Sequence, residues 1–186
     1  MINTWFISDT HFGHTNILEY EKVARPFSCL DEMHEVMIDR WNSVVKQNDI
    51  VYHLGDFAFG KHTIAIADRL RGKKRLIMGN HDSYPTNLYL NYFDKLYGIV
   101  FYKRCVLSHM PVHPNGLGKR WLLNVHGHLH SRNIMWNNIS IITESETGTI
   151  IIPPQYDENY FNVSCEQNNL IPIHRDVIME RLNELL

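Results

Sequence analysis

Short apolar runs alternate with polar loops along the first half of the chain. The runs are rich in β-branched and aromatic residues, which predicts strands, and they lie at 4–8, 49–56 and 74–82. Two segments between the runs, 31–46 and 62–70, have apolar residues three or four positions apart, which predicts helices. Strand and helix therefore alternate, and this order is typical of an α/β fold.

The second half of the chain has a different pattern, with short apolar runs and little helical periodicity between them. The runs lie at 98–103, 105–109, 121–126, 139–143, 149–153 and 160–165. They predict a second sheet, more antiparallel than the first, and residues 173–186 predict a closing helix. Residues 131–159 are the hardest to assign and are interpreted as a hairpin excursion. Pro153 and Pro154 argue against a central strand there.

The size and composition of the chain fit one globular domain, which we expect to span residues 1–186. The chain is 44% hydrophobic and 20% charged, enough apolar content for one core. Its net charge of -2 gives no electrostatic reason to expect nucleic acid or an anionic membrane as a partner. The sequence contains no run of about 18 apolar residues, so we expect no membrane-spanning helix. Three widely spaced cysteines without a CxxC motif favour a reducing cytosol, so we expect a cytoplasmic protein.

Polar residues with metal-binding side chains follow the predicted strands. They are Asp9, His11, Asp56, Asn80, His81, His109, His128 and His130. Binding sites in α/β folds gather beyond the carboxyl ends of strands, so we expect these side chains to converge. Carboxylate, amide and imidazole groups together suit Mn²⁺, Fe²⁺, Zn²⁺, Co²⁺ or Ni²⁺. The set is too large for one ion and fits two ions that share a bridging carboxylate.

The order of these motifs carries a family resemblance. Asp-x-His, Gly-Asp, Gly-Asn-His-Asp, His before Pro and Gly-His-x-His follow one another between residues 9 and 130. This set resembles the calcineurin-like metallophosphoesterase superfamily. The stretches SDTHFGH, RPF, VYHLGDF and FNVSCE resemble its small phage and bacterial members. The resemblance implies an α/β fold with two facing mixed β-sheets flanked by helices.

The resemblance also implies a role for each polar residue at the strand ends. It assigns Asp9, His11 and His130 to a first metal ion. It assigns Asn80, His109 and His128 to a second ion, with Asp56 as the bridge between the two. His81 would lie near the substrate phosphate and stabilise or protonate the departing oxygen, which suits an imidazole. Mn²⁺ is the expected metal for both sites.

The stretch 124–130, NVHGHLH, has three histidines on alternate positions. A continuous strand would place all three on one face. We expect Gly127 to end the strand instead, which leaves His126 as its last residue. His128 and His130 would then lie in a loop and serve different metal ions.

Several other residues near the motifs have more than one interpretation. We expect His53 and Asp82 to hydrogen-bond to the ligand turns rather than bind metal. His14 and His113 fit a substrate pocket or a loop role equally well. Arg25 is interpreted as a salt-bridge or surface residue rather than a phosphate contact. We expect glycine to give the backbone freedom for tight turns at Gly55, Gly79 and Gly127.

The function that these observations favour is a dinuclear metal-dependent phosphoesterase in which metal-activated water hydrolyses the ester. The resemblance to small family members favours a phosphodiester in a small nucleotide-like substrate. One alternative is a non-catalytic scaffold of the same fold that binds a protein partner. A nuclease is another, although the near-neutral charge counts against a long nucleic-acid groove. The sequence leaves the oligomeric state open.

Overall fold

The computed structural model describes residues 2–137, 141–145 and 148–186. Its first sheet has five strands in the order β13-β1-β2-β3-β4. These are Ile173–His174 (β13), Thr4–Ile7 (β1), Ile50–His53 (β2), Lys73–Ile77 (β3) and Lys95–Tyr97 (β4). The strands β1 to β4 are mutually parallel, and β13 joins β1 antiparallel at one edge. The three strands predicted in the first half of the chain are confirmed.

The second sheet has four strands in the order β12-β7-β6-β5. These are Tyr160–Asn162 (β12), Leu123–His126 (β7), Cys105–Ser108 (β6) and Val100–Tyr102 (β5). β12, β7 and β6 are parallel, and only β5 is antiparallel to its neighbour. One of its three pairings is antiparallel, against one of four in the first sheet, so the second sheet is only slightly more antiparallel than the first. Parallel strands need long connections, which are usually helical. The connections between β6, β7 and β12 contain little helix. The sequence therefore shows no helical periodicity there.

The longer helices match the sequence pattern with small differences. α2 spans Leu30–Val44 and α4 spans Arg175–Glu184, which confirms both predicted helices. The segment predicted as a helix at 62–70 is a 3₁₀ helix, Thr63–Arg69 (η1). Four shorter elements were not predicted. These are Ile17–Tyr20 (α1), Thr86–Tyr89 (α3), Pro114–Gly116 (η2) and Cys165–Asn168 (η3).

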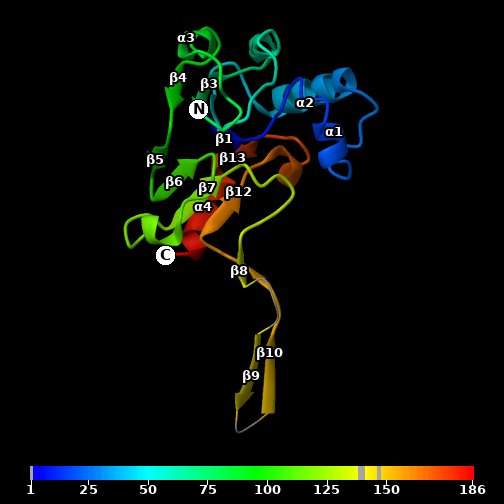
Figure 1. Ribbon diagram of the computed structural model, residues 1–186. Coiled ribbons are helices and arrows are strands. Elements are labelled where there is room, and N and C mark those ends of the chain that lie inside the picture. Colours follow the sequence, from blue (N-terminus) through cyan, green and yellow to red (C-terminus); the bar gives the residue numbers. More distant parts are fainter. Residues whose placement is uncertain (1, 138–140, 146–147) are drawn as a thin grey trace.

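Alternate residues of the first sheet pack into two separate apolar layers, as the two-residue repeat of a strand requires. Leu76 packs with Trp41 and Met37 of α2 in the layer beneath the helices. Its neighbour Ile77 packs with Leu107 of the second sheet, in the layer between the two sheets. Figure 1 shows α1, α2 and α3 beside the first sheet, whereas α4 contacts β1 and β13 and contributes Ile178 and Leu182 to the layer between the two sheets. The fold is mixed α/β, with two mixed sheets flanked by helices.

The segment after β7 forms an antiparallel ribbon that extends away from the two sheets (Figure 1). Met135–Asn137 (β8) pairs with Gln155–Tyr156 (β11), and Ile141–Ser145 (β9) pairs with Gly148–Ile152 (β10). Part of the strand predicted at 139–143 lies outside the described residues. Among the helices of the described residues, none is long and apolar enough to cross a bilayer.

The two apolar layers can be tested with neighbouring residues. Leu76→Ala and Ile77→Ala should each lower the free energy of unfolding by about 2–5 kcal/mol, because each leaves a cavity in a different buried layer. Urea denaturation measures both changes, and Lys73→Ala at an exposed position of β3 is the control. If one of the two core variants is as stable as the control, the two-layer arrangement is wrong.

Candidate metal centre

The candidate ligands lie where parallel strands of both sheets end. Strands β1, β2 and β3 of the first sheet and β6 and β7 of the second each run into a loop that carries at least one of them. The two sheets meet at this edge through a parallel bridge between Ser8 and Ser164. Ser8 N–H donates to Val163 O at 3.0 Å, and Cys165 N–H donates to Ser8 O at 3.0 Å. The candidate ligands therefore converge at the junction of the two sheets.

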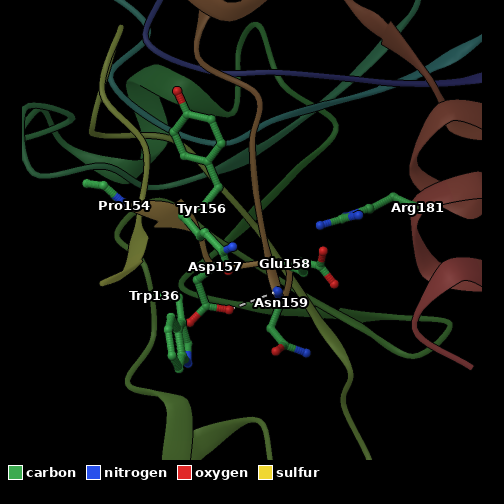
Figure 2. Close-up of a pocket in the computed structure, with 8 residues that line it drawn as sticks. Trp136, Pro154, Tyr156, Asp157, Glu158, Asn159 and Arg181 are labelled. Atoms are coloured by element: carbon green, nitrogen blue, oxygen red, sulfur yellow. Dashed lines mark hydrogen bonds between the residues drawn. The ribbon is translucent and has the colours of Figure 1, made fainter. Parts of the chain in front are cut away.

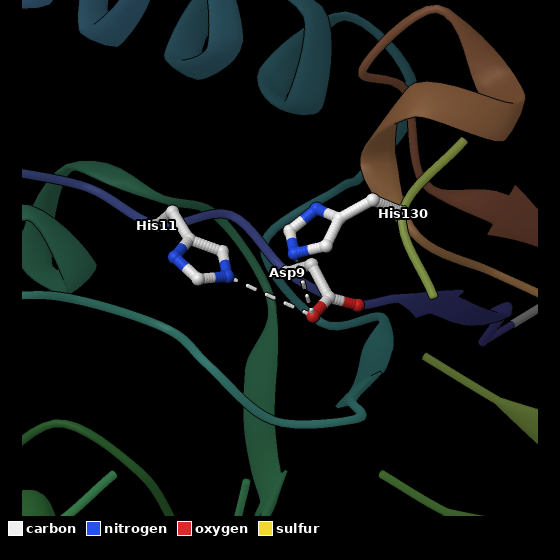
Figure 3. Close-up of side chains that lie close together, drawn as sticks. All are labelled: Asp9, His11 and His130. Atoms are coloured by element: carbon white, nitrogen blue, oxygen red, sulfur yellow. Dashed lines mark ion pairs between the residues drawn. The ribbon is translucent and has the colours of Figure 1, made fainter. Parts of the chain in front are cut away.

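The first candidate group contains Asp9, His11 and His130, whose ligand atoms all lie within 4.8 Å of one another. Figure 3 shows the Asp9 carboxylate beside both imidazoles. Asp9 Oδ1 lies 3.8 Å from His11 Nε2 and 3.9 Å from His130 Nε2. Among the described residues, Asp9 Oδ1 and His11 Nε2 are both buried without a hydrogen-bond partner. These separations are too long for hydrogen bonds, but they fit ligands that each lie about 2.1 Å from a shared ion.

The second candidate group contains Asp56, His109 and His128, again within 4.8 Å of one another. Asn80 belongs beside it, because Asn80 Oδ1 lies 2.9 Å from His109 Nε2. The Asp56 Oδ2 atom is 3.3 Å from His109 Nε2 and 3.6 Å from His11 Nε2. Asp56 is therefore placed between the two groups, where a bridging carboxylate has to lie. The donor types of both groups fit divalent transition-metal ions.

The backbone is left-handed at five of the candidate ligands. Positive φ values between 49° and 69° occur at Asp9, His11, Asp56, His128 and His130. Such values are uncommon outside glycine, cost about 1–3 kcal/mol each and persist only where surrounding structure enforces them. Hydrogen bonds from Asp9 N to Gly55 O at 3.0 Å and from His11 N to Asp56 O at 3.1 Å do so here. The fold therefore holds these five ligands in a locally unfavourable backbone conformation, which orients their side chains toward the candidate groups.

Glycines allow close approach between the loops that carry the candidate ligands. Gly55 has a φ of 96°, which confirms the tight turn expected there. Gly79 and Gly127 have no positive φ, so the same explanation was wrong for them. A Cβ on Gly127 would lie 2.5 Å from Asp9 Oδ2, and one on Gly79 would lie 2.5 Å from Asp56 N. Both positions need glycine because another loop passes too close for a side chain.

Asp82 holds the turn that carries Asp56. Its carboxylate accepts hydrogen bonds from the backbone N–H groups of Asp56 at 2.7 Å, Phe57 at 3.1 Å and Gly79 at 2.8 Å. His53 also lies outside both candidate groups, and its Nε2 contacts Thr10 Oγ1, in the loop between Asp9 and His11, at 3.0 Å. The hydrogen-bonding interpretation of Asp82 and His53 agrees with these contacts.

The remaining histidines near the motifs separate into distinct environments. His14 Nδ1 contacts His11 Nδ1 at 3.2 Å, so it supports a member of the first group. His113 caps η2 by accepting from Asn115 N, which is a loop role. His126 is the last residue of β7, and its Nδ1 contacts Gly127 O at 2.8 Å. The stretch 124–130 therefore divides as expected, with His128 and His130 in different groups.

Arg25 and Glu166 adjoin the first group, which the sequence interpretation did not anticipate. Arg25 forms a salt bridge with Glu166, which confirms one of its two interpretations, and it is fully buried, so the alternative of a surface residue was wrong. Glu166 also contacts His130 Nδ1 at 3.0 Å. A signal for Glu166 was present in the sequence, because it follows the strand β12 just as the candidate ligands follow theirs. The stretches RPF and FNVSCE, which resemble small family members, contain Arg25 and Glu166, but nothing in the sequence showed that these two residues pair.

The ionisable side chains of the two groups have pKa values that shift in different directions. Burial raises the pKa of Asp9, but the surrounding imidazoles of His11, His109 and His130 outweigh burial and hold the pKa well below its ordinary value. The Asp9 carboxylate therefore stays ionised. Burial lowers the pKa of His11 and of His128. Burial also acts on His109 and His130, but their hydrogen bonds to Asp56 and Glu166 outweigh it and raise the pKa of both. Neutral rings keep a nitrogen lone pair, and this pair can bind a metal ion.

His81 lies at the open side of the second candidate group. Its side chain is 46% exposed, and its Nε2 is 4.0 Å from Asp56 Oδ2. Its backbone N–H donates to Asp56 Oδ1 at 2.9 Å, which fixes the residue relative to the bridging position. The ring of Phe59 lies 4.8 Å away, measured between ring centroids. His81 can therefore reach a molecule that enters from solvent.

Two pockets differ in their relation to these groups. A pocket of about 360 Å³ is lined by Asn80 and His109 and opens beside the second group. A pocket of about 780 Å³ lies at the base of the ribbon, between Trp136, Tyr156 and Arg181 (Figure 2). None of the residues that line the larger pocket is a candidate ligand. The smaller pocket is therefore the one that adjoins the candidate chemistry.

Comparison with known proteins identifies the family of this chain. The calcineurin-like phosphoesterase family matches residues 2–173. An uncharacterized protein of Methanocaldococcus jannaschii is 31% identical, over 99% of this chain and 93% of that protein. The gene 66 protein of Mycobacterium phage L5 is also 31% identical, over 75% of this chain and 83% of that protein. The chain belongs to the calcineurin-like phosphoesterase family, whose members are metal-dependent hydrolases.

A solved structure has the same fold. A protein of unknown function from Aquifex aeolicus is 27% identical and superimposes with a TM-score of 0.69. The match covers 97% of this chain and 99% of that chain. The resemblance of the motifs to this family, and to phage and bacterial members of it, is therefore confirmed.

The close approach at Gly127 can be tested by adding one methyl group. Gly127→Ala should lower the free energy of unfolding by about 1–3 kcal/mol, because the new Cβ would overlap Ser8 Oγ and Asp9 Oδ2. It should also reduce the metal content of the purified protein, because Asp9 must move. Urea denaturation and elemental analysis measure the two effects. Gly116→Ala, which meets no atom within 4 Å, is the control. Equal stability and metal content in both variants would rule out the close approach.

Proposed function

We propose that this protein is a dinuclear metal-dependent phosphodiesterase that acts on a small nucleotide-like substrate. The observation that carries the proposal is the pair of candidate groups with Asp56 between them. In the proposal, Asp9, His11 and His130 hold one ion, and Asn80, His109 and His128 hold the other. Mn²⁺ is the proposed metal. Two divalent ions would make a water molecule acidic at neutral pH and neutralise phosphate charge during its attack.

The side chains of the chain itself would position the ions and handle the leaving group. Asp56 would hold the two ions at a fixed separation, because Asp82 fixes its turn through three backbone hydrogen bonds. His81 would donate a proton to the departing oxygen, since its exposed ring lies beside Asp56 at the open side of the site. The backbone hydrogen bond from His81 to Asp56 Oδ1 would hold His81 at a fixed position relative to the bridging carboxylate.

Two features support a small substrate. The pocket beside Asn80 and His109 has a volume of about 360 Å³, near the lower end of the range for small-molecule sites. The net charge of -2 offers little long-range attraction for a nucleic-acid polymer. The choice of a diester over a monoester rests on the resemblance to small family members. We also propose that residues 1–186 form one domain and that the protein is cytoplasmic. Three free cysteines support the cytoplasmic location.

The bridging role of Asp56 predicts a loss of both metal and activity. Asp56→Asn should lower the hydrolysis of bis-p-nitrophenyl phosphate by Mn²⁺-loaded protein at least about 100-fold, because the neutral amide cannot serve both ions. Elemental analysis should find fewer than two ions per chain. Asp31→Asn, at an exposed position of α2, is the control and should match the wild type. A folded, metal-replete wild type that is inert on a broad panel of phosphate monoesters and diesters would refute the proposed function.

The proposed proton donation by His81 predicts a dependence on the leaving group. His81→Ala should slow hydrolysis of an alkyl phosphodiester by about 100-fold or more, because an alkoxide needs a proton to depart. Hydrolysis of the nitrophenyl diester should fall much less, because nitrophenolate is a stable anion. Steady-state kinetics on both substrates measure the difference, with exposed His62→Ala as the control. Equal losses on both substrates would contradict proton donation.

A further inference from the structure

Arg25 lies beneath the first candidate group as a fully buried cation. Its Nη1 donates to Thr10 O at 3.0 Å, and its Nη2 donates to Asp9 O. Its Nε donates to Glu166 Oε1 at 2.7 Å. The guanidinium therefore joins the loop after β1, where Asp9 has a left-handed backbone, to the segment after β12. A rigid planar fork suits this arrangement, because each donor has a fixed direction.

Glu166 connects this arginine to His130. Its side chain has no exposed surface, and its Oε1 also contacts His130 Nδ1 at 3.0 Å. Arginine stays protonated in proteins, and the adjacent cation keeps the Glu166 carboxylate ionised. An ionised carboxylate can only accept a hydrogen bond, so His130 donates from Nδ1. The other ring nitrogen, Nε2, is then left to face Asp9 Oδ1 at 3.9 Å.

In the second candidate group, the Nδ1 atom of the buried histidine has an uncharged hydrogen-bond partner. His109 Nδ1 contacts the neutral backbone carbonyl of Leu54 at 2.8 Å. A carboxylate partner orients an imidazole and makes it a stronger donor to a metal, more so than a neutral carbonyl does. The supports of the two candidate groups are therefore unequal.

We propose that Arg25 and Glu166 are positioning residues for the first metal site. They hold His130 in the Nδ1-protonated tautomer and fix the backbone of Asp9, so that the group of Asp9, His11 and His130 binds its ion more tightly than the second group does. This inference rests on the metal-binding roles in the proposed function. It adds two residues that touch neither ion nor substrate.

The tautomer can be measured before any metal is added. Metal-free wild-type protein with ¹⁵N-labelled histidine is examined by long-range ¹H–¹⁵N correlation, at a pH where the His130 ring is neutral. The expected result is a proton on Nδ1 and none on Nε2. A neutral ring that carries its proton on Nε2 would overturn the inference. This measurement requires neither activity nor a variant.

Metal affinity provides the second test. Glu166→Gln keeps the shape of the side chain but removes its charge. Titration calorimetry with Mn²⁺ should show one site weakened at least about tenfold and the other almost unchanged. Glu35→Gln is the control, because Glu35 also pairs with an arginine, Arg69, but does so on an exposed surface. Two unchanged sites, or two sites weakened equally, would overturn the inference.

Loss of one partner of a buried ion pair destabilises a protein, so Glu166→Gln needs a companion that leaves no unpaired charge. The double variant Arg25→Met/Glu166→Gln removes both charges and should show the same selective loss at one site. Arg69→Met/Glu35→Gln is its control. Failure of the wild type itself to bind Mn²⁺ would refute the proposed function. Normal binding by the wild type and by the double variant would refute only the roles of Arg25 and Glu166.

Discussion

The candidate metal centre depends on the shared direction of strands in two sheets. β1, β2 and β3 run parallel in one sheet, and β6, β7 and β12 run parallel in the other. The bridge between Ser8 and Ser164 joins the sheets where these strands end. Loops that are far apart in the sequence therefore deliver their side chains to one place. Reversal of any of these strands would carry its polar residues to the opposite edge.

The convergence of the loops does not by itself orient the side chains of the ligands. Strained backbone conformations and buried polar groups orient them. Five candidate ligands have positive φ values, and each is stabilised only by its surroundings. Asp82 holds one turn through three backbone hydrogen bonds, and Arg25 holds another through two carbonyls. Asp9 Oδ1 and His11 Nε2 are buried without a partner. A divalent ion would satisfy both atoms and offset the cost of burying them.

The sequence predicted those parts of the structure that depend on local pattern. Apolar runs located β1, β2, β3, β6 and β7, and the polar residues after these strands located both candidate groups. The parallel pairings of β6, β7 and β12 were not predicted, because the connections between these strands contain little helix. Gly127 was explained wrongly, because its close approach to Asp9 is a tertiary contact. A salt bridge was one of the interpretations of Arg25, but its burial was not foreseen, since its partner Glu166 lies 141 positions away along the chain.

The central claim is that two ions bind at the junction of the sheets and share Asp56. Anomalous X-ray diffraction from a crystal grown with Mn²⁺ tests it most directly. The account predicts two strong anomalous peaks per chain, one among Asp9, His11 and His130 and the other among Asn80, His109 and His128, with Asp56 contacting both. A single peak, or peaks only at another place such as the acidic pocket at the base of the ribbon, would contradict it.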